Sequence, residues 1–323
     1  MLAEGSMVTV FGGSGFVGRY AVRKLAKRSY RIRNAVRRPD LAGHLQPMGA
    51  VGQIQSVQAN LRDADSIRRA VDGASIVINL VAVLAESGRQ RFDALHVEGA
   101  RRVAKAAREA GAQALVHISA IGADPRSPSR YAKSKAGGEA AVLSEMPGAV
   151  ILRPSLVFGP EDELFNRFAG LAQSSPFLPL IGGRTRFQPV YVGDVADAVV
   201  AALDGKAKPG AAYELGGPEI INFRELLQRV MQYSGHQRPL LPMPFWLAKL
   251  MALVTKPLPM MLRPMTVDQV RMLQRDNVVS KAASEAGLTL AGLGIAAPQA
   301  IETVVPAYLE RFNPRGQFAH YRG

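Results

Sequence analysis

The feature that most constrains the fold is an apolar run that breaks into glycines. Residues 7–19 read MVTVFGGSGFVGR, in which a β-rich stretch precedes the glycines and a helical pattern follows them. Either glycine spacing, GxxGxxG or GxGxxG, lets the backbone turn tightly beside a pyrophosphate while the start of a helix points free N–H groups at its charge. Because the motif lies between a strand and a helix, it predicts a dinucleotide-binding turn. The expected contacts are Gly12, Ser14, Gly15, Phe16, Val17 and Gly18.

Short β-rich runs alternate with amphipathic helical stretches through the first half of the chain. The predicted strands are residues 8–11, 31–36, 54–59, 76–81, 114–119 and 150–152. Strand and helix alternating in this way argue for βαβ crossovers and a parallel sheet covered on both faces. The expected fold class is therefore α/β, a doubly wound Rossmann parallel sheet with a smaller, mostly helical C-terminal lobe.

The alternation is lost after Pro154, where Pro, Gly and Met become frequent. This change predicts a nucleotide-binding domain over residues 1–155, a smaller lobe over 156–300 and a tail over 301–323. Residues 188–204 contain PVYVGDVADAVVAAL, a strand end followed by a helix, and are expected to return to the first domain. The later YELGG is expected to add a short strand there.

The end of the second predicted strand indicates which dinucleotide is bound. An acid about 20 residues past the glycines hydrogen-bonds the 2′-hydroxyl of NAD, whereas an arginine accepts the 2′-phosphate of NADP. This strand ends in NAVRRPD, so Val36 takes the acid position and Arg37 and Arg38 follow it. NADP(H) is therefore preferred over NAD(H). An arginine pair that is plain surface would leave NAD(H) open.

Tyr131 and Lys135 form a YxxxK motif, YAKSK, which places both side chains on one face of a helix. A lysine ammonium close to a phenol lowers the tyrosine pKa from about 10 toward the working range of a general acid. Ser119 ends the preceding strand and is placed to polarise a substrate carbonyl. These three residues are the predicted catalytic set.

Taken together, the motifs resemble the short-chain dehydrogenases/reductases in their extended or atypical form. The matching pieces, in the order of that superfamily, are GGSGFVG, ANLRD, VINLVA, HIS with YAKSK, RPSLVFGP and PVYVGDVADA. The resemblance implies that Lys135 holds the ribose hydroxyls. It also implies further cofactor contacts from Asn60 and Leu61 at the adenine, Leu80, Val81 and Ala82 at the ribose, and Pro154 and Val157 at the nicotinamide, beside Ser119 and Tyr131.

A narrower resemblance extends over nearly the whole chain. VTVFGGSGFVGR, HISAIGADPRSPSRYAKSKAGGE and ILRPSLVFGPEDELFNRFA are similar to the nucleotide-binding accessory subunits of respiratory complex I and their bacterial relatives. This resemblance implies tightly held NADPH, partners among the complex I subunits of the peripheral arm, and a cytoplasmic position peripheral to the inner membrane. His96, Asn60 and Phe11 replace an Asn, an Asp and a Thr of the catalytic enzymes, which argues against a full proton relay and leaves the cofactor site largely intact.

The composition of the chain restricts the kinds of ligand and partner that the protein is expected to bind. The 40 Lys and Arg against 26 Asp and Glu give a formal net charge of +14, so the surface attracts anions. The chain has no cysteine and five scattered histidines, so no metal site is expected. An aromatic and basic tail without a recognisable nucleic-acid module leaves nucleic acid unexpected as a partner.

Residues 226–267 contain no acid and hold PMPFWLAKLMALVTKPLPMMLRPM with the only tryptophan, Trp246. Lys249, Lys256 and several prolines interrupt this stretch, so it cannot span a bilayer. Three interpretations stay open: a helix in the core of the lobe, a face for a protein partner, or a segment in the membrane interface with snorkelling lysines.

Two functions fit the sequence. The first is an NAD(P)H-binding accessory subunit of membrane-associated complex I, in which the cofactor is mainly structural or regulatory. The alternative is a free NADP(H)-dependent reductase or epimerase that acts on an unknown carbonyl substrate, with Tyr131 as acid/base. The sequence leaves open whether the protein turns over a substrate.

Overall fold

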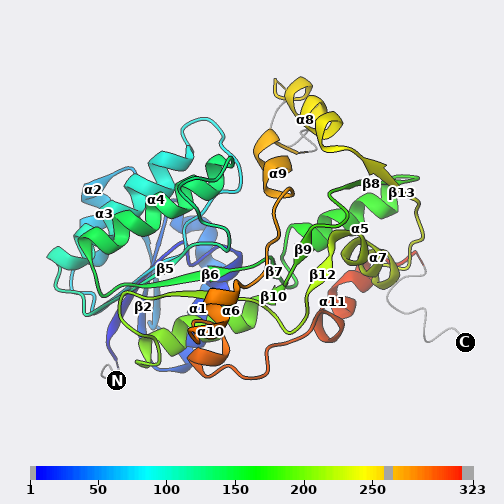
Figure 1. Ribbon diagram of the computed structural model, residues 1–323. Helices are drawn as coiled ribbons and strands as arrows, with labels where there is room; N and C mark the ends of the chain where they lie inside the picture. Colours follow the sequence, from blue (N-terminus) through cyan, green and yellow to red (C-terminus); the bar gives the residue numbers. More distant parts are fainter. Residues whose placement is uncertain (1–4, 258–264, 315–323) are drawn as a thin grey trace, which may run out of the picture. The chain divides into compact units, whose positions relative to one another are not determined.

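The computed structural model describes residues 5–257 and 265–314 of the 323-residue chain. The chain divides into two compact units (Figure 1). The first unit comprises Met1–Pro154, Val192–Leu215 and Val279–Ala297, and the second comprises Ser155–Tyr191, Gly216–Val278 and Pro298–Gly323. Each unit is therefore built from segments far apart in the sequence.

A seven-stranded parallel sheet forms the centre of the first unit, in the order β11-β6-β5-β4-β1-β2-β3. All four residues of β4 are buried, as expected for a strand covered on both faces. The order reverses between β1 and β4, and ligands of such sheets bind beyond the carboxyl ends of the strands at this point. The predicted α/β fold class is confirmed. The strands are β1 (Met7–Phe11), β2 (Arg31–Val36), β3 (Ile54–Gln58), β4 (Ile76–Asn79), β5 (Ala114–Ile118), β6 (Val150–Pro154) and β11 (Ala212–Leu215).

Helices cover both faces of this sheet (Figure 1). On one side lie α2 (Ala64–Val71), α3 (Glu98–Glu109) and α4 (Arg130–Glu145), and on the other lie α1 (Phe16–Lys27) and α6 (Val192–Leu203). Alanines and glycine on the buried side of α3 allow close packing. The first unit also contains the helical turns η1 (Pro39–Met48), η2 (Asp93–Val97) and η4 (Ala291–Leu293) and the short helix α10 (Lys281–Glu285).

A largely buried ion network ties β6 and β11 to a helix. Arg153 on β6 donates from Nε and Nη2 to the two carboxylate oxygens of Glu139 on α4, at 2.9 and 2.6 Å. Its Nη1 lies 3.7 Å from Oε1 of Glu214 on β11, whose Oε2 accepts the backbone N–H of Ser280 at 2.7 Å. The strand that completes the sheet is thus held by charge as well as by its backbone ladder.

The second unit is mostly helical, as predicted. Its helices α5 (Leu164–Ser174), α7 (Phe223–Tyr233) and α11 (Ile301–Leu309) pack around a core that includes Phe158, Phe165 and Phe223. The unit also contains α8 (Phe245–Val254), α9 (Val267–Met272) and η5 (Glu310–Phe312). Its short strands pair as β7 (Val157–Phe158) with β10 (Val190–Tyr191), β9 (Arg186–Phe187) with β12 (Ile221–Asn222), and β8 (Leu178–Ile181) with β13 (Leu240–Met243).

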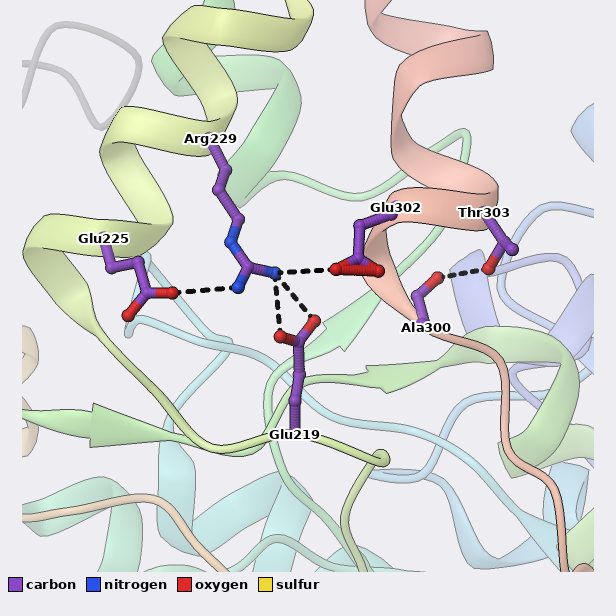
Figure 2. Close-up of polar contacts among 6 residues, drawn as sticks. All are labelled: Glu219, Glu225, Arg229, Ala300, Glu302 and Thr303. Atoms are coloured by element: carbon purple, nitrogen blue, oxygen red, sulfur yellow. Dashed lines mark hydrogen bonds and ion pairs between the residues drawn. The ribbon is translucent and has the colours of Figure 1, made fainter.

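Arg229 on α7 interacts with three glutamates within the second unit (Figure 2). It donates to both oxygens of Glu219 at 2.9 and 2.8 Å and to Glu225 at 2.8 Å, while Glu302 at the start of α11 lies 3.8 Å away. The sequence analysis expected a tail from residue 301, but residues 301–309 form the helix α11. The ion pair between Arg229 and Glu302 connects α11 to α7. Residues 315–323, with the rest of that tail, lie outside the described residues, as do residues 258–264 of the Met- and Pro-rich segment.

Candidate nucleotide-binding site

The glycine turn joins β1 to α1, and backbone geometry at Gly12 and Gly18 disfavours any side chain there. Gly12 has a φ of +80°, and a Cβ on it would lie 3.1 Å from Cγ2 of Val81. A Cβ on Gly18 would lie 2.2 Å from the carbonyl oxygen of Gly12, so only glycine lets α1 approach the turn this closely. A Cβ on Gly15, by contrast, would meet only that same carbonyl oxygen, at 3.3 Å. Gly15 is exposed, so the backbone of the turn is accessible to solvent at this position.

The start of α1 suits an anion. Gly15 is its N-cap with extended backbone angles and provides no side-chain cap, and the first turn has no acidic residue. The N–H groups of a first turn have no partner within the helix, and the helix dipole adds positive potential there. In this 12-residue helix the turn thus offers donors and space to a pyrophosphate. The predicted contacts from Gly12 to Gly18 lie together at this end of the sheet.

The two arginines after β2 differ in their surroundings. Arg38 donates from Nη2 to Oδ2 of Asp40 at 2.8 Å, so its guanidinium already has a carboxylate partner. Arg37 is exposed and has no ion-pair partner among the described residues. Arg37 is therefore the better placed of the two for an additional phosphate.

The residues after β3 and β4 contribute mainly backbone to this edge of the sheet. Leu61 is 5% exposed and belongs to the core of the first unit, and Oδ1 of Asn60 accepts the backbone N–H of Arg62 at 3.1 Å. Leu80 donates its N–H to the carbonyl of Phe11 at 3.0 Å, which keeps the segment 80–82 beside the end of β1.

Lys135 fixes the predicted catalytic helix to the end of β5. Its Nζ donates to the carbonyl oxygen of Ile118 at 2.7 Å, and the side chain is almost fully buried. Ser129 caps α4 by accepting the N–H of Ala132 at 3.2 Å, which sets the helical register of the YxxxK motif. Ser119 follows Ile118 directly, and its buried Oγ has no hydrogen-bond partner among the described residues. Most buried hydroxyls in folded proteins have a hydrogen-bond partner, so the Ser119 hydroxyl has hydrogen-bonding capacity that a ligand could use.

The electrostatics of the YxxxK pair differ from the prediction. Burial raises the pKa of Tyr131 to about 12, whereas the sequence predicted that Lys135 would lower it. Burial also lowers the pKa of Lys135 to about 8, against an opposing effect of Glu139. Desolvation disfavours both charged forms, and here it outweighs any attraction between them.

His96 connects the segment after β4 to the catalytic helix. Its Nε2 accepts the backbone N–H of Val83 at 3.0 Å, so the ring proton must be on Nδ1, which donates to Oγ of Ser134 at 2.8 Å. Ser134 in turn donates to the carbonyl of Tyr131 at 2.7 Å, and the rings of His96 and Tyr131 meet edge to face with centroids 5.6 Å apart. Burial, then the charge of Lys135, lowers the pKa of His96 to about 3, so the ring is neutral.

The sequence did not identify a second buried polar pair beneath this site. Nδ2 of Asn79 donates to Nδ1 of His117 at 3.2 Å, and burial holds the pKa of His117 well below its ordinary value, with Lys135 adding to the effect. Asn79 and His117 are polar residues in the otherwise apolar strands β4 and β5, and this pattern could have indicated the pair.

Of the two residues expected at the nicotinamide, Pro154 ends β6 in the first unit and Val157 lies in β7 of the second unit.

No group of three or more His, Cys, Asp or Glu side chains suited to a metal ion occurs among residues 5–257 and 265–314. Over the same ranges, no helix has the length and apolar character needed to cross a membrane.

Comparison with known proteins identifies relatives that cover both units. Residues 8–216 match the NAD dependent epimerase/dehydratase family. The chain is 38% identical to NADH dehydrogenase (ubiquinone) 1 alpha subcomplex subunit 9, mitochondrial, of Arabidopsis thaliana, over 86% of this chain and 72% of that one. It is 33% identical to ceramide reductase of Caulobacter vibrioides over 60% of each chain. Among solved structures it is similar to NADPH-dependent quinone oxidoreductase QOR2 of Escherichia coli complexed with NADPH, with a TM-score of 0.73 and 20% identity over 94% of this chain and 99% of that one.

Proposed function

The chain belongs to the NAD dependent epimerase/dehydratase family, and from this premise we propose that it is an NAD(P)H-binding accessory subunit of membrane-associated respiratory complex I. The observation that carries the proposal is 38% identity over 86% of the chain to a protein named as a subunit of NADH dehydrogenase (ubiquinone). The family match ends at residue 216, whereas 86% of the chain aligns with this subunit, so the similarity includes part of the C-terminal lobe. A shared nucleotide-binding domain alone would not explain that extent. The cofactor in this proposal is mainly structural or regulatory.

The residues around the glycine turn fit a nicotinamide dinucleotide. The start of α1 would hold the pyrophosphate, and segments 60–61 and 80–82 would flank the adenine and the ribose. Arg37 would bind the 2′-phosphate, since it is exposed and has no ion-pair partner in the described chain. We therefore propose NADP(H) as the preferred cofactor, with NAD(H) bound more weakly.

The surroundings of Tyr131 favour retention of the cofactor over turnover. Bound NADPH supplies a hydride, and a reductase would need a proton donor whose pKa is near the working pH. Burial raises the pKa of the Tyr131 hydroxyl to about 12, which makes it a weaker proton donor than an ordinary tyrosine. In this proposal Lys135 positions the ribose and Tyr131 lines the pocket.

A free reductase is the second candidate, and two observations favour it. The buried Oγ of Ser119 has no partner in the described chain and is placed at the end of β5, where a substrate carbonyl would lie. A relative that is 33% identical over 60% of the chain is named for a reductase activity. Oxidation of NADPH against a panel of carbonyl and quinone substrates, wild type beside Tyr131→Phe, separates the candidates. Sustained oxidation that disappears in the variant would establish the reductase.

The accessory-subunit proposal places the protein on the peripheral arm of complex I, at the cytoplasmic face of the inner membrane. The direct test is purification of the tagged full-length protein from membranes of its own cells, followed by mass spectrometry of the nucleotide and proteins that accompany it. We expect NADPH and subunits of complex I. Recovery of the protein without any complex I subunit, under conditions that keep complex I intact, would overturn the proposal.

A further inference from the structure

Helix α8 of the second unit presents its large apolar side chains to solvent. The exposed residues Trp246, Leu250 and Leu253 lie along one face, and Leu247 and Val254 extend it. The residues that α8 buries are small, Ala248 at 0% and Ala252 at 4% exposure. A surface helix of a soluble domain normally turns its large apolar residues inward and its polar residues outward. The orientation of α8 is the reverse.

The packing of α8 shows why it is turned this way. Ala248 belongs to a small cluster with Ile181 of β8 and Val270 of α9, and the alanine side lets the helix lie close to both elements. Helical spacing places Ala248 and Ala252 on the face opposite Trp246, Leu250 and Leu253. The exposed face therefore has five large apolar side chains and no charged residue, and Lys249 lies at its edge, half-buried.

Positive charge lies beside the start of this helix. Arg184 and Arg224 line a hollow of about 540 Å³ together with Met243 and Phe245, the first residue of α8. Both arginines are exposed, and neither has an ion-pair partner in the described part of the chain. Lys256, just beyond the helix, is also exposed, and the sequence has no acid from residue 226 to residue 267.

We propose that the exposed face of α8, defined by Trp246, Leu247, Leu250, Leu253 and Val254, docks on an anionic phospholipid surface. Arg184 and Arg224 would bind the lipid phosphates and the apolar face would enter the acyl boundary. The proposal deepens the membrane-associated function proposed above and rests on it for the location of the membrane.

Three features favour lipid over a protein partner. The exposed face offers no hydrogen-bonding group except the indole N–H of Trp246, and lipid tails require none. A tryptophan beside aliphatic residues and flanking cations is the composition of a helix that lies in the membrane interface. The 10 residues of α8 span about 15 Å, half the hydrocarbon thickness of a bilayer, so the helix is too short to cross a membrane and would bind at its interface.

Trp246 is the only tryptophan of the chain, so its fluorescence reports directly on this face. The purified full-length protein is titrated with phosphatidylcholine vesicles that contain or lack phosphatidylglycerol, and binding is measured by sedimentation and by the emission maximum. We expect a blue shift and co-sedimentation with the anionic vesicles. In Leu250→Ser/Leu253→Ser the partition coefficient should fall at least about tenfold, because two leucines no longer enter the acyl boundary.

Matched controls separate the site from general charge and hydrophobicity. Leu41→Ser removes a leucine that is 63% exposed in the first unit and should leave binding unchanged. Arg184→Gln/Arg224→Gln should weaken binding to anionic vesicles about tenfold. Arg23→Gln/Arg69→Gln removes the same charge from exposed positions of the first unit and should weaken binding less than twofold.

Two results would overturn the lipid proposal: no binding of the wild type to anionic vesicles, or equal losses in the site variants and their controls. A protein partner on this face would appear as the first of these results. Bound NADPH is measured in the same preparations. Vesicle binding lost with NADPH retained refutes the lipid site alone, and NADPH absent with vesicle binding kept refutes the proposed cofactor function alone.

Discussion

Replacing Gly15 by aspartate should change the stability of the free protein and its response to NADPH in opposite directions. Gly15 is the N-cap of α1, with φ of −76° and ψ of −178°, in the region that an N-cap aspartate adopts. A Cβ there meets only the Gly12 carbonyl oxygen, at 3.3 Å, so the side chain is accommodated with a small adjustment. The carboxylate can then accept an N–H group of the first turn and interact favourably with the helix dipole.

The magnitudes are well separated. An aspartate in place of glycine at an N-cap contributes a few tenths of a kcal/mol, and its charge at the helix start contributes about 0.3–1 kcal/mol more. The unfolding free energy of the nucleotide-free protein should therefore rise by about 0.5–1 kcal/mol. Wild-type protein at a hundredfold excess of NADPH over Kd should gain about 2.7 kcal/mol, and the aspartate should remove that gain because its carboxylate occupies the place of the pyrophosphate.

Thermal denaturation with and without NADPH measures both effects. Gly15→Asn is the matched control, since asparagine caps the helix with the same shape and without charge, and it should keep part of the NADPH response. If Gly15→Asp melted with the full wild-type response to NADPH, the phosphates would not lie at the start of α1 and the assignment of the site would be refuted.

Three further predictions concern the same site. Arg37→Ala should reduce the preference for NADPH over NADH more than Arg38→Ala does, because Arg38 is already held in an ion pair. Calorimetry measures both affinities, and equal affinities of the wild type for NADPH and NADH would refute the assignment of Arg37 to the 2′-phosphate. Lys135→Ala should lower NADPH retention more than Tyr131→Phe, as quantified by nucleotide released from purified protein, and the reverse order would contradict the ribose-binding role of the lysine. Stability should fall as the pH decreases from 6.5 toward 3, because the unfolded state protonates His96 at its ordinary pKa while the folded state resists until about 3. Urea denaturation of His96→Asn should show a shallower dependence over that range, and an unchanged slope would mean that His96 does not carry this effect.

The sheet could be predicted because its strands are buried on both faces and therefore appear as short apolar runs. The six strands expected in the first half form β1 to β6, and YELGG contributes β11. The glycine turn could also be predicted, since the positive φ of Gly12 and the close backbone approach at Gly18 both favour glycine.

The features that could not be predicted from the sequence depend on how deeply a side chain is buried and on which way a helix face points. The YxxxK spacing indicates that Tyr131 and Lys135 share a helix face, but the pKa of Tyr131 follows from desolvation by the surrounding fold. The composition of α8 indicates an apolar helix, but only its packing shows that Ala248 faces inward and Trp246 outward. The distribution of Pro154 and Val157 between two units is likewise a property of the chain path.

The order of segments in the first unit bears on how the protein is made. β6 ends at Pro154, and its neighbour β11 begins only at Ala212, after the chain has passed through part of the second unit. Glu214 of β11 then bonds to Ser280, which is synthesised later still. During translation, β6 is therefore an open edge until β11 leaves the ribosome, and unpaired edges of this kind invite association with other chains. An N-terminal fragment that ends at Pro154 would therefore lack β11 and the segment around Ser280, both of which belong to the first unit.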